Sequence, residues 1–278
     1  MTEDTESLRL GFDSVPAIYD RIRPTYPSAL YDDLFALLPP EPTIVEVGPG
    51  TGQATADLLK LGAIVTAVEI GADLARFLER KLGAYDRLKI IRSSFEDAPL
   101  PGRVYDAVVS ATAYHWVQPP ARLEKPAAIL KPHGKLAVID TNQVASPVDR
   151  GYFERVQPIY EKHGQAAEKH RHLPTAGDVV PDIFGELAAS SQYDDVRLFR
   201  YPWDQRYTGR EYADLLRSYS GSQSMPEEER EALIRELCAI IDEEYGGSIT
   251  RPLVITLTVA RMKVSDLRPS PYARESTA

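Results

Sequence analysis

The sequence predicts an α/β protein of the Rossmann-like, doubly wound class, with a mostly parallel seven-stranded sheet and a helical cap from the C-terminal half. Five short apolar segments alternate with helix-like segments between residues 43 and 142. Parallel strands joined by right-handed helical crossovers produce this alternation, because the crossovers place helices over the sheet. Two further strand-like segments, 195–203 and 248–262, bring the expected number of strands to seven.

The N-terminal half supplies the regular part of this fold. Leucines spaced on one helical face predict a helix over 27–40, which Pro39 and Pro40 end. The first strand, 43–47, is short and β-branched, and the helix after it can stop at Gly62. The five alternating strands are expected at 43–47, 64–69, 87–92, 104–110 and 135–141.

The C-terminal half departs from the alternation. Helical stretches are expected around 150–163 and 178–190. Two Ser/Thr-x-x-Glu patterns, Thr208 with Glu211 and Ser224 with Glu227, predict capping boxes at two further helix starts. Pro252 is expected at the beginning of the 248–262 strand or on a sheet edge, because proline cannot donate to a strand ladder. The segment 264–278 lacks apolar periodicity and is expected to be a flexible tail.

Composition restricts the partners. The 278 residues carry 32 Lys and Arg against 41 Asp and Glu, and the formal net charge of −9 disfavours nucleic acid and favours a small molecule. Cys238 is the single cysteine, which excludes an intrachain disulfide and a thiolate metal cluster. The acidic start and the lack of a long apolar run lead us to expect a cytoplasmic protein that does not enter a membrane. We also expect a monomer or a homodimer.

The segment VEVGPGTGQAT (45–55) contains the most informative motif. Gly48, Gly50 and Gly52 follow a strand and open a helix, where ligands of open α/β sheets bind. A tight turn without a ligand is the alternative reading. A dinucleotide site would have a third glycine where Gln53 stands, and Glu46 would repel a pyrophosphate but could hold a cationic amino group. The motif therefore predicts a nucleoside-like, positively charged ligand.

Glu69 ends the second expected strand, 21 residues after Gly48. A carboxylate at this point can accept hydrogen bonds from both ribose hydroxyls. An ordinary charged strand end is the alternative. Ribose binding by itself fits NAD as well as other nucleosides.

These motifs resemble those of the class I methyltransferases that use S-adenosylmethionine. The resemblance rests on VEVGPGTGQAT, AVEIGADLARFL, SSFEDAPLPGRVYDAVVSATAYHWVQP and LKPHGKLAVID, with an upstream FDSVPAIYDRIRPTYPSAL, and covers most of residues 10–263. Within the family the chain looks most like the small-molecule branch, which has a His-Trp pair after the fourth strand. The resemblance implies S-adenosylmethionine as cofactor and S-adenosylhomocysteine as product.

The resemblance also implies residues for the cofactor site: Tyr19, Tyr26, Glu46, Gly48, Pro49, Gly50, Gly52, Gln53, Glu69, Ile70, Ser94, Phe95, Ser110 and Ala111. Glu46 and the glycines would surround the methionine part, Glu69 would hold the ribose, and Ile70 would flank the adenine. Ser94 stands where the family usually has an acidic residue beside the adenine. Segment 1–42, with Tyr19 and Tyr26, would fold over the cofactor bound to a core at 43–142. Residues 143–263 would supply the cap and the last two strands.

Methyl transfer from a sulfonium is an in-line displacement, so positioning in a dry pocket accounts for much of it. His115 is the candidate general base, because it follows the fourth strand and histidine titrates near neutral pH. The alternative is a pocket-wall histidine. Tyr114, Trp116 and Trp203 fit either an acceptor pocket or the core.

The histidines of EKHGQAAEKHRH (161–172) lack the spacing of known metal sites, so we expect no metal. The expected function is methyl transfer to a small molecule, at oxygen. An NAD-dependent oxidoreductase and a non-catalytic S-adenosylmethionine-binding protein are the alternatives.

Overall fold

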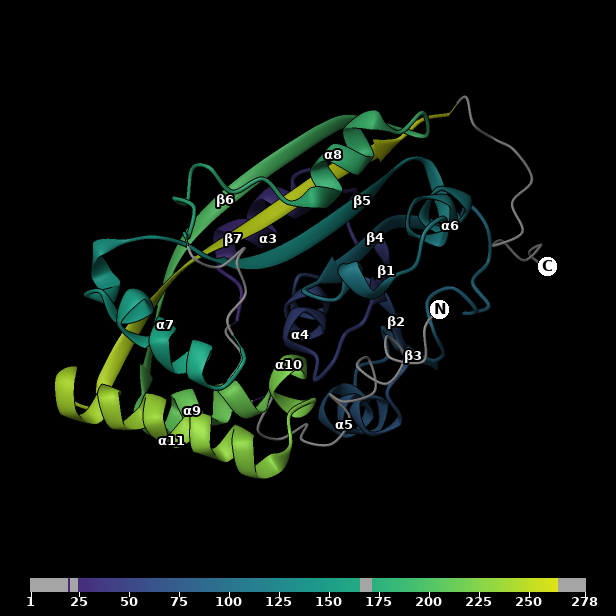
Figure 1. Ribbon diagram of the computed structural model, residues 1–278. Helices are drawn as coiled ribbons and strands as arrows, with labels where there is room; N and C mark the ends of the chain where they lie inside the picture. Colours follow the sequence, from purple (N-terminus) through teal and green to yellow (C-terminus); the bar gives the residue numbers. More distant parts are fainter. Residues whose placement is uncertain (1–19, 21–24, 166–171, 265–278) are drawn as a thin grey trace. The chain divides into compact units, whose positions relative to one another are not determined.

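The computed structural model describes residues 20, 25–165 and 172–264 (Figure 1). Tyr19 and the segment 265–278 therefore lie outside the described residues. The chain divides into two units. The glycine-turn unit comprises Thr25–Asp140, Val180–Tyr201 and Thr256–Ala278, and the helix-rich unit comprises Met1–Pro24, Thr141–Val179 and Pro202–Ile255.

A seven-stranded sheet has the order β3-β2-β1-β4-β5-β7-β6, which confirms the predicted α/β fold and the number of strands. Strands β1 to β5 pair in parallel, as the registers Val45↔Thr66 and Val45↔Val108 illustrate. The strands are β1 Thr43–Val47, β2 Ile64–Glu69, β3 Leu88–Arg92, β4 Tyr105–Ala111, β5 Leu130–Gln143, β6 Tyr193–Thr208 and β7 Ser248–Met262.

Strand β7 lies between β5 and β6 and runs antiparallel to both. The main-chain N–H of Val144 donates to the Pro252 carbonyl, and the Thr256 hydroxyl donates to the main-chain carbonyl of Asp140. The numbers of these partners rise along one strand as they fall along the other, as in an antiparallel pair. The expectation that Pro252 begins this strand or lies on an edge is wrong, because β7 is interior and Pro252 is its fifth residue.

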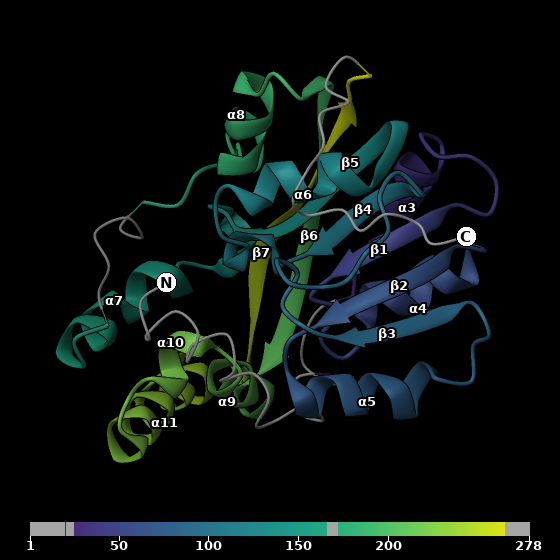
Figure 2. The ribbon, with the colours of Figure 1, turned by 90° about the vertical axis from the view of Figure 1, so that its right-hand side faces the viewer.

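The helices of the glycine-turn unit cover both faces of its sheet. Val45 and Val47 share a buried cluster with Ala121 of one helix and Ile183 of another. Alternate residues of a strand face opposite sides, so Glu46 points to the other face. Helix α5 runs along β3 in Figure 2. The described helices of this unit are α3 Ser28–Phe35, α4 Gln53–Lys60, α5 Ala72–Leu82, α6 Ala121–Ile129 and α8 Asp182–Ala189, with a 3₁₀ turn at Tyr114–Trp116.

Helix α3 is shorter than the predicted 27–40 helix. It ends at Phe35, and the N–H groups of Leu37 and Leu38 then donate to carbonyls three residues back. Pro39 disfavours the helical conformation at Leu38, so the chain tightens into 3₁₀-type turns before the proline pair.

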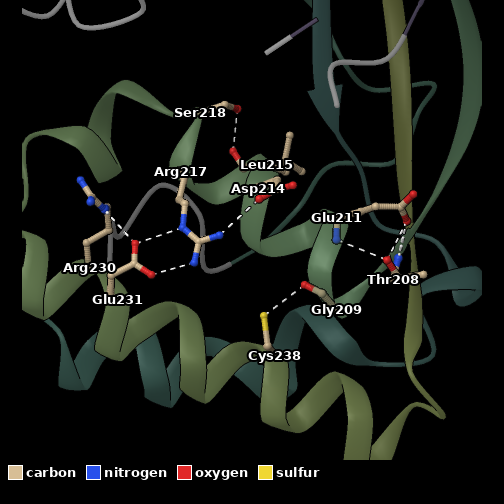
Figure 3. A network of polar contacts seen from close by, with 10 residues as sticks. All are labelled: Thr208, Gly209, Glu211, Asp214, Leu215, Arg217, Ser218, Arg230, Glu231 and Cys238. Carbon is tan, nitrogen blue, oxygen red and sulfur yellow. Dashed lines mark hydrogen bonds and ion pairs between the residues drawn. The ribbon is translucent and has the colours of Figure 1, made fainter. Parts of the chain in front are cut away.

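The helix-rich unit has its own core. Its helices are α7 Tyr152–Lys162, α9 Gly209–Arg217, α10 Ser220–Gln223 and α11 Glu227–Glu244, with a 3₁₀ turn at Pro147–Asp149. Helix α9 packs against α11, and their contact buries Leu216, Leu237 and Ile241. Figure 3 shows polar contacts of the same helix pair: Arg217 pairs with Glu231, and the Cys238 thiol donates to the Gly209 carbonyl.

Of the two predicted capping boxes, one forms. Thr208 accepts from the Glu211 N–H while the Glu211 carboxylate accepts from the Thr208 N–H, which confirms the first (Figure 3). The second is wrong: α11 begins at Glu227 with Pro226 as N-cap and without a side-chain cap. No helix in the described part of the chain is long and apolar enough to cross a membrane.

Candidate functional site

The glycine turn joins β1 to α4 in a conformation that requires glycine. Gly48, Gly50 and Gly52 have φ values of 67°, 58° and 85°. A Cβ on Gly48 would lie 2.6 Å from the Ala113 Cβ, and one on Gly52 would lie 2.6 Å from Leu78 Cδ1. Because conformation and packing already demand glycine here, the spacing of the motif alone does not indicate a ligand.

Stronger evidence for a ligand comes from buried polar atoms beside this turn. Glu46 is 1% exposed, and its Oε2 has no hydrogen-bond partner among the described residues. The Tyr31 hydroxyl and the Gln53 Nε2 are also buried without a partner in the described chain. Native proteins rarely leave buried polar atoms unpaired, so a group of them at one turn indicates that a polar ligand binds there.

The charge of Glu46 defines the sign of that ligand. Burial raises the pKa of Glu46 to about 7; the nearby Thr55 hydroxyl and N–H lower it, and the negative charge of Glu69 raises it further. A positively charged ligand would stabilise the ionised carboxylate by supplying the missing counter-charge. The ammonium and sulfonium groups of S-adenosylmethionine fit this requirement.

Glu69 supports the turn directly. Its carboxylate accepts from the Gly50 N–H at 3.0 Å and from the Gly71 N–H at 2.8 Å. Glu69 is 4% exposed, so it is a buried part of the turn rather than an ordinary charged strand end. Its role at the ribose stays a prediction.

The loop after β3 is held by a buried lysine that the sequence did not single out. The Lys125 ammonium donates to the carbonyls of Glu96 and Ala98 and lies 5.3 Å from the centroid of the Phe95 ring. Burial lowers the pKa of Lys125 to about 8, an effect that Asp97 and Glu96 partly offset. Ser94 donates to Asp97, and Phe95 is buried in the core. In the sequence, the signal that could have indicated this role was a lysine on an otherwise apolar helix face.

The residues after β4 also occupy defined places. The Ser110 hydroxyl is buried and donates to the Val47 carbonyl, so it ties β4 to β1. Ala111 ends the strand, and the next residue, Thr112, has a φ of 54°. The hydroxyls of Thr112 and Tyr26 lie 3.3 Å apart. Tyr26 therefore contacts the loop that follows β4, as an N-terminal segment folding over this end of the sheet would require.

Tyr114, His115 and Trp116 form a 3₁₀ turn and differ in burial. Tyr114 is 2% exposed and donates to the Arg122 carbonyl, so it packs in the core. His115 is exposed, and its ring centroid lies 5.0 Å from that of Trp116. Desolvation of the ring, and then the charge of Arg122, lower the pKa of His115. The neutral imidazole therefore dominates at neutral pH, the form that a general base needs.

Two further predicted positions are Ile70 and Trp203. Ile70 is half-buried directly after Glu69. Trp203 belongs to the helix-rich unit, where its Nε1 donates to Gln205. Its place in an acceptor pocket stays a prediction. Within the described residues, no group of three or more His, Cys, Asp or Glu side chains could hold a metal ion.

Comparisons with known proteins identify the family of the chain. Residues 45–138 match the model of the methyltransferase domain. The chain is 30% identical to an uncharacterized methyltransferase of Geobacillus sp. over 149 residues, which are 51% of this chain and 67% of that protein. The chain belongs to the class I methyltransferase family. An uncharacterized methyltransferase of Mycobacterium tuberculosis is also 30% identical, over 50% of this chain; the chain spans about half, 55%, of that relative's length.

Solved structures support the same fold. The chain matches a proposed type II methyltransferase from Anaeromyxobacter dehalogenans with a TM-score of 0.59 and 20% identity, over 87% of this chain and 97% of that one. It matches the phosphoethanolamine N-methyltransferase 2 of Haemonchus contortus in complex with S-adenosyl-L-methionine with a TM-score of 0.51 and 13% identity, over 90% of this chain and 57% of that one. At these identities the matches show the fold alone.

Proposed function

We propose that this methyltransferase binds S-adenosylmethionine at the glycine turn and transfers its methyl group to a small-molecule acceptor, at oxygen, by in-line displacement. The observation that carries the cofactor assignment is the buried Glu46 with its unpaired oxygen beside Gly48 to Gly52. Family membership supports it. When bound, the cofactor would supply a methyl group activated by a sulfonium.

The chain's own residues bind and orient. Glu46 would pair with the ammonium of the methionine part, since its carboxylate has no counter-charge in the described chain. Glu69 holds the turn through Gly50 and Gly71 and would accept from the ribose. Lys125 orders the loop that carries Ser94 and would thereby fix the adenine side of the site.

A proton must leave the acceptor when the attacking atom is a hydroxyl oxygen. The imidazole of His115, neutral because its pKa is lowered, would take up that proton on a ring nitrogen. A hydroxyl or a protonated amine must lose a proton to such a base, whereas a carboxylate or thiolate needs none, so a role for His115 would favour the first two kinds of acceptor.

Isothermal calorimetry tests the cofactor assignment. We expect heat with S-adenosylhomocysteine and none with NAD. Gly50→Val should weaken S-adenosylhomocysteine binding by about tenfold or more, because a branched side chain at the φ of 58° strains the turn that would hold the ligand.

Gly185→Val is the matched control. Gly185 lies in α8, does not have a positive φ, and has open space where a Cβ would stand, so S-adenosylhomocysteine affinity should be unchanged. Heat with NAD but not with S-adenosylhomocysteine would refute the assignment and support the oxidoreductase alternative.

A further inference from the structure

The helix-rich unit contains an arginine with unusual partners. Arg251, in β7, donates from Nη1 to the Tyr219 hydroxyl at 2.7 Å and from Nη2 to Gln143 Oε1 at 2.6 Å. Its guanidinium carbon lies 6.0 Å from the centroid of the Tyr212 ring. These partners are all uncharged side chains.

No carboxylate contacts this guanidinium among the described residues, and its Nε is buried without a partner there. A guanidinium has five N–H donors, so the two bonds leave three. Arg217 of the same unit shows the usual arrangement, since two of its nitrogens donate to the Glu231 carboxylate (Figure 3). Arg251 therefore has a charge and a donor group that the described chain does not satisfy.

The surroundings of Arg251 are phenolic. The hydroxyls of Tyr160 and Tyr212 lie 3.5 Å apart, and Tyr152 packs edge-on against Tyr212 at 5.7 Å between ring centroids. The Tyr152 hydroxyl is also buried without a partner in the described chain. An unpaired charge in such surroundings is expensive, because phenol groups replace only part of its hydration. A ligand anion would remove that cost.

We propose that Arg251 and the tyrosines around it form a binding site for the carboxylate of a small organic acid. The planar guanidinium can donate two parallel bonds to a carboxylate, and Nε has the donor that such a pair uses. The tyrosine rings supply apolar surface for the body of the acid.

A carboxylate fits better than a phosphate. Among the described residues, Arg251 is a cation that contacts both the Tyr219 hydroxyl and the Tyr212 ring. One guanidinium balances a single negative charge, whereas a phosphate near neutral pH carries up to two. All residues of the proposed site belong to the helix-rich unit.

Calorimetry on the full chain tests this site. The probes are acetate, succinate and benzoate, their neutral amides, and inorganic phosphate as a separate arm. We expect at least one acid to bind and its amide not to bind. Arg251→Met should weaken acid binding by about tenfold or more, because it removes the charge and both donor bonds at similar side-chain length.

Arg206→Met is the matched control. Arg206 is exposed on β6 of the same unit and donates to the Ser248 hydroxyl, so acid binding should be unchanged. Arg251→Lys keeps the charge but loses the planar fork, so it should weaken acid binding measurably even where the methionine variant fails to fold. Binding of S-adenosylhomocysteine should be equal in all these variants.

Three results would overturn the site: no binding of any carboxylate, equal acid binding with and without Arg251, or binding of phosphate alone. If the wild-type protein bound an acid but did not bind S-adenosylhomocysteine, the proposed function would be refuted and the acid site would still be supported.

Discussion

Glu46 combines burial, charge and an unpaired oxygen at one residue. Its carboxylate is 1% exposed, and burial raises its pKa from 4.5 to about 7. A group held in this way destabilises the ligand-free protein when it is ionised. It can strengthen binding of a cation for the same reason, because the ligand supplies the counter-charge.

Replacing Glu46 by Gln should separate these two effects. The pKa of Glu46 is raised in the folded state. Between about pH 4.5 and pH 7, the folded protein therefore keeps a proton on Glu46 that the unfolded chain has lost. As the pH rises through that window, Glu46 lowers the stability of the folded protein. At pH 8 we expect Glu46→Gln to raise the free energy of unfolding by up to about 3 kcal/mol. S-adenosylhomocysteine affinity should fall in the same variant.

Urea unfolding at pH 5 and pH 8 with parallel calorimetry would check both effects. The stability gain should fall to about a quarter of its pH 8 value at pH 5, because folded wild-type Glu46 is protonated there while the unfolded carboxyl is only partly ionised. An equal gain at both pH values would contradict the linkage. Unchanged S-adenosylhomocysteine affinity would remove Glu46 from the cofactor site.

His115 allows a second test at the scale of one residue. If its neutral imidazole accepts the acceptor's proton, His115→Ala should lower turnover by about 100-fold and leave S-adenosylhomocysteine affinity unchanged. Because desolvation and Arg122 lower its pKa, the wild-type rate should rise with pH through a value below 6.5 and level off above it.

Turnover on an acid or alcohol that the wild-type protein methylates, together with an NMR titration of His115, would measure both quantities. His133→Asn is the control, because His133 is exposed and its φ of 64° suits asparagine. If His115→Ala kept the turnover of the wild type, His115 would be a pocket-wall residue and not a general base.

At the scale of elements, the two capping-box patterns show how one neighbour changes a helix start. Thr208 forms the full reciprocal pair with Glu211. Ser224 has the same spacing to Glu227, but Pro226 stands between them. Proline has a fixed φ and lacks an N–H, and it restricts Met225 before it, so α11 starts after Pro226 and Ser224 is not the cap.

We expect Thr208→Ala to lower the free energy of unfolding by about 1 kcal/mol, because the Glu211 N–H loses its partner at the start of α9. Thr208→Ser keeps the hydroxyl and should retain most of the stability. Urea unfolding of the three proteins measures the difference, and equal losses for Ala and Ser would show that packing of the threonine methyl matters more than the cap.

Strand positions were predicted well where the chain is apolar and β-branched. The segments 43–47, 64–69 and 248–262 match β1, β2 and β7 at both ends. Strands β5 and β6 extend beyond their predicted bounds, to Leu130–Gln143 and Tyr193–Thr208. Their added residues are largely polar or half-buried, so apolar periodicity does not mark them.

At the scale of the whole molecule, two units account for different parts of the proposed chemistry. The glycine-turn unit contains the methyltransferase-domain match and the Glu46 site. The helix-rich unit contains the Arg251 cluster and its own core around α9 and α11. The chain has an excess of carboxylates, with a formal net charge of −9. From composition alone, we would therefore not expect the buried Nε of Arg251 to lack a carboxylate partner among the described residues.

The sequence by itself determined the α/β class, most strand positions, the glycine turn and the two glutamates beside it, because these depend on periodicity and on residue types close together in the chain. Only the tertiary structure decided that Glu46 Oε2 lacks a partner, that Lys125 holds the loop after β3, that β7 inserts between β5 and β6, and that Arg251 meets Gln143. The physical reason is that burial and hydrogen bonding join residues far apart in the chain, such as Arg251 and Gln143, and no local pattern records which groups that packing leaves unpaired.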